Sequence, residues 1–69
     1  MLHRVEIEES IGQAFRARVA YHFGSLDNDL ALAATEEARA SAVARFGKSV
    51  ETCLKAKAAA LRVVEKFAE

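Results

Sequence analysis

The chain has 69 residues and one cysteine, so it can form a single small domain without an internal disulfide. Ten basic residues balance ten acidic ones, and a net charge of zero argues against binding to nucleic acid or to an anionic membrane. One cysteine and two widely separated histidines do not supply the four ligands of a structural zinc site. Because a chain this short buries little surface, we expect a second subunit to complete its core.

The cellular compartment of the protein is predicted from targeting and membrane-spanning features that the sequence does not contain. It contains no run of about 20 apolar residues that could span a bilayer. Its first ten residues carry three glutamates and lack the basic-then-apolar pattern of a signal peptide. A lone thiol fits a reducing compartment. The sequence therefore predicts a cytoplasmic protein with no membrane association.

The first segment, residues 3–23, has two interpretations. Val5 and Ile7 alternate with charged residues, which is the period-2 pattern of a β-strand. Ser10 and Gln13 would then form a capping box that starts a helix at about residue 11. In the other interpretation one helix covers residues 3–23. An isolated strand needs a partner strand and the chain offers no second one, so we expect helix.

Two glycines divide the rest of the chain. Gly24 is followed by several helix-capping residues, which predicts the end of one helix and the start of another over about 28–46. Gly47 either ends that second helix, with a third over 49–68, or is tolerated inside a continuous helix. Fifteen alanines and the absence of proline favour helix throughout. The predicted fold class is all-α: one domain, residues 1–69, folded as a helical hairpin or as three short helices.

Apolar residues recur with helical spacing on one face of each segment. Two hairpins packed side by side would make a four-helix bundle with a closed core, so we expect a homodimer. Arg18 and Lys57 also fall among the apolar positions. Each either extends to solvent over its neighbours or meets an acidic residue across an interface, for which Glu37 is a candidate. The candidate interface residues are Ile11, Phe15, Val19, Val50, Leu54, Leu61, Val64 and Phe67, with Arg18 and Lys57 as candidate polar members.

No pattern in the sequence places a catalytic, cofactor or metal site. Residues 42–49 end in Gly-Lys-Ser like a phosphate-binding loop, but Ala42 replaces the first glycine and the pattern is helical. His22 fits a cap at a helix C-terminus, and Cys53 fits a small hydrophobe on an apolar face. No spacing pairs two carboxylates or a nucleophile with a base. We therefore expect no enzymatic activity, no cofactor, no metal and no small-molecule substrate.

Two functional hypotheses follow. The leading one is a non-enzymatic helical protein-interaction module that self-associates and binds another protein. The alternative is a dimeric DNA-binding regulator of the ribbon-helix-helix type, in which residues 3–8 form the ribbon. In that case Glu6 and Glu8 would face the major groove beside Arg4, although DNA recognition usually places Arg, Lys, Asn or Gln there. The backbone of residues 3–8 distinguishes the two hypotheses.

Overall fold

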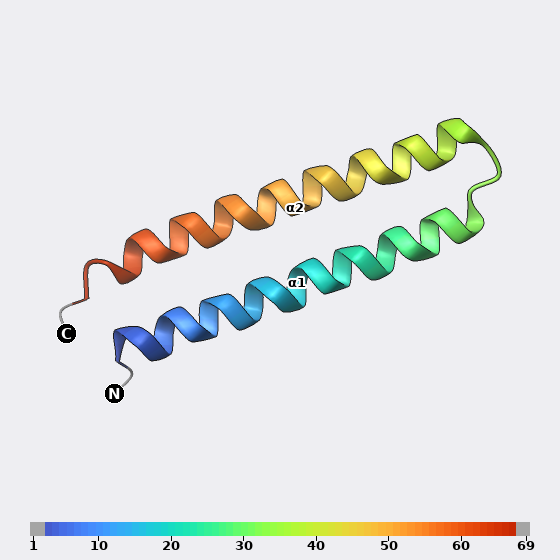
Figure 1. The fold of residues 1–69 in the computed structure, drawn as a ribbon. Coiled ribbons are helices and arrows are strands. Elements are labelled where there is room, and N and C mark those ends of the chain that lie inside the picture. The colour runs from blue at the N-terminus through green and yellow to red at the C-terminus, as the bar shows by residue number, and fades with distance from the viewer. Residues whose placement is uncertain (1–2, 68–69) are drawn as a thin grey trace.

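The computed structural model describes residues 3–67 as a helical hairpin (Figure 1). Helix α1 covers Arg4–Leu32 and helix α2 covers Glu36–Val64, each with 29 residues. Residues 33–35 join them, so the helices run antiparallel and their outer ends lie together (Figure 1). Neither helix has an apolar stretch long enough to cross a bilayer over the described residues. The all-α prediction is confirmed, and its hairpin form is the one observed.

The helix boundary predicted at Gly24 is wrong, whereas at Gly47 the continuous helix, one of the two alternatives left open, is the one observed. Gly24 lies inside α1, Gly47 lies inside α2, and neither adopts a positive φ. The three helices predicted over about 3–23, 28–46 and 49–68 are therefore two; α2 ends at Val64, and residue 68 lies outside the described residues. A glycine inside a helix costs only about 1 kcal/mol. That cost is smaller than the packing lost if either helix stopped halfway along its partner.

The turn between the helices lies at residues 33–35 instead. Thr35 is the N-cap of α2, and its Oγ1 accepts a hydrogen bond from the Ala38 backbone N–H at 3.0 Å. Glu36 and Glu37 occupy the first turn of α2, where their negative charges interact favourably with the helix dipole and stabilise the helix. A threonine followed by two acidic residues is a recognisable helix start. This helix start prevails over the one predicted after Gly24, because a turn at residues 33–35 lets α1 extend along the full length of α2.

Residues Arg4 to Glu8 belong to α1, so the strand interpretation of residues 3–8 is wrong and the helical one is confirmed. His3 is the N-cap, and its backbone N–H donates to Glu6 Oε1 at 3.0 Å. Ser10 lies inside the helix, so the predicted capping box at that residue does not start it. Within residues 3–67 the ribbon required by the DNA-binding hypothesis is not formed.

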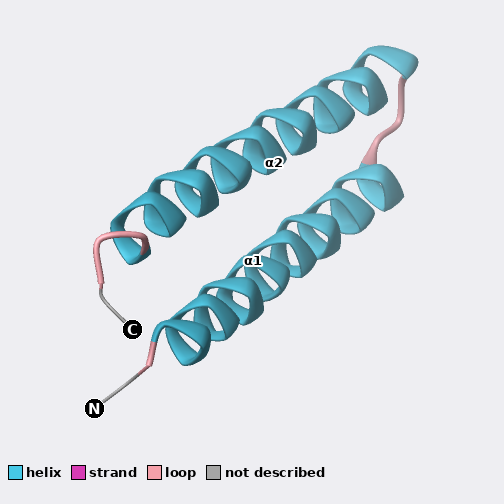
Figure 2. Cartoon of the chain, turned by 60° about the vertical axis from the view of Figure 1, so that its left-hand side comes forward, coloured by secondary structure: helices cyan, strands magenta, loops and turns pink. Residues whose placement is uncertain are grey.

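The two helices meet along a narrow seam. Among residues 3–67 only Ala42, Cys53 and Val64 are buried, and all three belong to α2. They recur every eleven residues, which is close to three helical turns, so they lie in one line along the helix. The half-buried residues of α1 along the same seam include Ile11, Phe15, Val19, His22 and Leu26. The hairpin is thus a single layer of two helices joined by a short loop (Figure 2).

Candidate interaction surfaces

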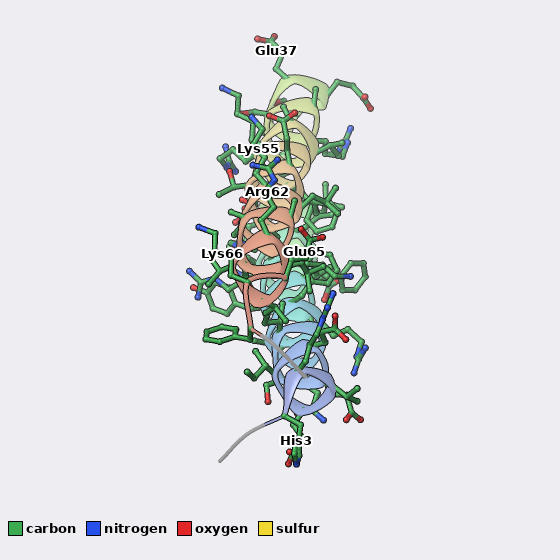
Figure 3. The ribbon with its side chains drawn as sticks, turned by 90° about the vertical axis from the view of Figure 1, so that its left-hand side faces the viewer. His3, Glu37, Lys55, Arg62, Glu65 and Lys66 are labelled. Atoms are coloured by element: carbon green, nitrogen blue, oxygen red, sulfur yellow. The ribbon has the colours of Figure 1, made fainter. Side chains whose placement is uncertain are left out.

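Two flanks of the hairpin carry side chains that the seam does not bury. Viewed end-on, side chains project from both sides of the two stacked helices (Figure 3). Helical positions two residues apart point in nearly opposite directions. On α2, Thr52 and Ala56 therefore lie on one flank and Leu54 lies on the other. The flank with Thr52 and Ala56 is hollowed by a groove, whereas the flank with Leu54 carries large aliphatic side chains.

The groove has a volume of about 590 Å³ and runs between the helices. Its polar lining includes Arg18, Lys57 and His22, and among residues 3–67 no carboxylate lines it. We call this surface the cationic groove. It is lined from α1 by Ile11, Phe15 and Arg18 and from α2 by Cys53, Lys57 and Ala60.

Aromatic rings position both cations of the groove. The Lys57 Nζ lies 4.6 Å from the centroid of the Phe15 ring on the opposite helix. The Arg18 guanidinium lies 5.3 Å from the centroid of the Tyr21 ring, one turn along the same helix. These are cation–π distances. Glu37 projects away from α1 at the far end of α2 (Figure 3), roughly 30 Å along the helix from Lys57.

Within residues 3–67 the histidines and the cysteine do not assemble into a reactive site. His22 lies in the middle of α1, so its predicted role as a C-terminal cap is wrong; its ring instead meets the Tyr21 ring edge-on at 5.3 Å. Cys53 is a buried free thiol. No group of three His, Cys, Asp or Glu residues that could hold a metal exists among residues 3–67. Residues 47–49 form part of regular α2, so their backbone does not wrap a phosphate.

The opposite surface, which we call the aliphatic flank, displays large apolar side chains from both helices. Phe23 is 59% exposed, and its ring meets the Phe46 ring of α2 edge-on, with 6.4 Å between the ring centroids. Along α2 an apolar stripe with helical spacing runs from Val43 to Leu61, with Gly47 and Ala58 as its small members. Lys57 is the charged residue at this spacing, and its ammonium group lies over the Phe15 ring. The flank comprises Val19, Phe23 and Leu30 of α1 with Val43, Val50, Leu54 and Leu61 of α2.

The structure divides the predicted interface residues between the seam and the surface. Ile11, Phe15, Val19, Val50 and Leu61 are half-buried and Val64 is buried, whereas Leu54 and Phe67 are about half exposed. Sequence reasoning missed Leu30 as an interface candidate because it ended the first helix near Gly24. It also missed Phe23, which lies inside the predicted helix one turn after Val19. The helical period places Phe23 on the same flank as Val19, and continuing that period through Gly24 would have added Leu30.

No protein-family model, curated protein or solved structure matches this chain. Its function is therefore inferred from the two flanks and from the surface that the hairpin leaves uncovered.

Proposed function

We propose that this chain is a non-enzymatic helical protein-interaction module that associates with a second copy of itself and binds a further protein. The observation that carries the proposal is the exposed apolar surface. Among residues 3–67, nine large hydrophobic residues are exposed to solvent, whereas only three hydrophobic residues, of small or medium size, are buried. A seam this thin gives little stabilisation to a chain of this size, and partner subunits are a common remedy.

The area left uncovered is sufficient for a stable interface. The chain exposes 5426 Å², whereas a compact monomer of the same mass exposes about 4,200 Å². The excess of roughly 1,200 Å² is larger than the about 800 Å² that each partner contributes to a standard protein interface. The radius of gyration, 16.1 Å, likewise exceeds the about 11 Å expected of a compact domain. A second hairpin would convert the single layer into a four-helix bundle.

The cationic groove supports the second part of the proposal. It is apolar along Ile11 and Phe15 and carries Arg18 and Lys57, and none of its lining residues in the described part of the chain is a carboxylate. A groove of this shape suits an amphipathic helix from another protein. Charge complementarity selects a helix whose apolar face is bordered by aspartate or glutamate residues.

Analytical ultracentrifugation of the chain over a range of micromolar concentrations tests the self-association. We expect a dimer that dissociates on dilution, with circular dichroism showing a parallel loss of helix. A well-folded monomer of 7.5 kDa throughout that range would overturn the proposal.

A further inference from the structure

We propose that two copies of the chain pair through the aliphatic flank, antiparallel about a two-fold axis, and leave the cationic groove open. The inference rests on the proposed self-association and assigns it to one of the two flanks.

Charge favours the aliphatic flank over the groove as the surface between copies. Within the stripe of α2 from Val43 to Leu61 the charged residue is Lys57, and its ammonium group is drawn out of the flank, because it lies over the Phe15 ring and lines the groove. The groove, in contrast, contains Arg18 and Lys57. A copy docked over the groove would remove both cations from water, and the described lining residues offer no carboxylate to compensate them, which is unfavourable. Docking on the aliphatic flank buries Phe23, Val43 and Leu54 without this cost.

The aliphatic flank is also electrostatically complementary to itself. Arg16 and Asp27 lie eleven residues apart in α1, so they point in nearly the same direction. Neither forms an ion pair with another residue of the described chain. Phe23 lies seven residues from Arg16, two turns along the same face.

A two-fold interface brings each residue pair together twice. Suppose that the α1 helices of two copies pack antiparallel and that the two-fold axis passes midway between Arg16 and Asp27. Arg16 of each copy then meets Asp27 of the other. The apolar residues Val19 and Phe23 then lie near the axis. A self-complementary pattern of this kind identifies the occupant as a second copy, because an unrelated partner would not require it.

Three aspartate substitutions at equally exposed valine and leucine positions test the flank. Val43, Leu54 and Val63 are each 53% exposed in the hairpin. Val43 and Leu54 lie on the aliphatic flank, whereas Val63 lies seven residues from Ala56 and therefore on the groove side. In sedimentation, Val43→Asp and Leu54→Asp should each raise the dimer dissociation constant about 100-fold or more, because each places a charge in a desolvated interface. Val63→Asp should change it by less than about threefold.

Reversing the charges of the proposed Arg16–Asp27 pair gives a second test of the dimer interface, and this test does not substitute any apolar residue. Arg16→Asp should raise the dissociation constant about tenfold, and adding Asp27→Arg should restore most of the loss. Arg18→Asp in the groove is the matched control and should leave the constant nearly unchanged.

Dissociation by Val63→Asp or Arg18→Asp, with Val43→Asp and Leu54→Asp still dimeric, would overturn the assignment to the aliphatic flank. Failure of the double variant to recover would overturn the antiparallel arrangement. A monomeric unmodified chain is a different result, because it overturns the proposed self-association itself.

Discussion

Lys57 shows how a charged residue can occupy a position where the helical period requires an apolar one. It follows Cys53 by one turn along the seam, so its aliphatic stem covers apolar neighbours. Its ammonium group ends over the Phe15 ring of the opposite helix. Such a contact contributes about 0.5–1 kcal/mol at a partly exposed site. The same placement puts a positive charge in the groove, where another protein can meet it.

Leu61 and Lys55 provide a paired test, at the scale of single residues, of a half-buried and an exposed position of α2. Leu61 is half-buried, so Leu61→Asp brings a carboxylate into a largely desolvated position and should cost roughly 2–3 kcal/mol. Lys55 is 77% exposed and pairs only with Glu51, one turn away. Exposed pairs contribute little, so Lys55→Asp should cost less than about 1 kcal/mol.

Thermal unfolding followed by circular dichroism, at one protein concentration, measures both substitutions. The Tm should fall by at least about 10 °C for Leu61→Asp and by only a few degrees for Lys55→Asp. Equal shifts would mean that Leu61 does not contribute to the packed side of α2.

At the scale of elements, both helices continue through a glycine. Gly24 and Gly47 have no neighbouring atom within 4 Å of the place where a Cβ would stand, and neither has a positive φ. No turn, close approach or left-handed backbone therefore requires glycine at either position. Their presence weakens each helix locally without ending it, because glycine leaves the backbone more freedom to lose on folding.

Gly24→Ala should therefore stabilise the chain by about 0.5–1 kcal/mol and raise the Tm by a few degrees. The reciprocal control is Ala17→Gly, at an exposed position of the same helix, which should lower stability by a similar amount. Circular dichroism melts of both variants provide the measurement. A loss of stability in Gly24→Ala would show that the glycine has a conformational role in α1.

At the scale of the whole molecule, one hairpin presents two surfaces of different character. The aliphatic flank suits a second copy, and the cationic groove on the opposite side suits an acidic amphipathic helix. If both are occupied, the four-helix bundle carries two equivalent grooves, one for each copy. A single layer of two helices has a small core and leaves both flanks uncovered. The same geometry would then account for the small core of the hairpin and for the proposed binding at its two flanks.

Reversing the charge of the groove tests the binding of a further protein. Arg18→Glu combined with Lys57→Glu should abolish capture of the acidic partner by the tagged chain from extracts of its native host. Lys48→Glu combined with Lys55→Glu is the matched control, because it changes the net charge equally on exposed positions of α2. Mass spectrometry of captured proteins and an assay of captured nucleic acid give the result. Equal capture by both double variants would exclude the groove as the binding surface.

The sequence by itself determined the helical class and the N-terminal helix. These follow from short-range properties: fifteen alanines, no proline and no second strand to pair with residues 3–8. The absence of any spacing that would place reactive groups together was likewise visible along the chain, and it led to the expectation of a protein without catalysis.

Only the tertiary structure decided where the chain turns and which apolar residues remain uncovered. The turn at residues 33–35 produces two helices of equal length, and the packing gained along the whole seam exceeds the cost of about 1 kcal/mol for each internal glycine. That gain depends on contacts between residues far apart in sequence, such as Phe15 with Lys57 and Phe23 with Phe46. Helical periodicity identifies an apolar face, but the register of the second helix decides which part of that face is buried and which part remains exposed.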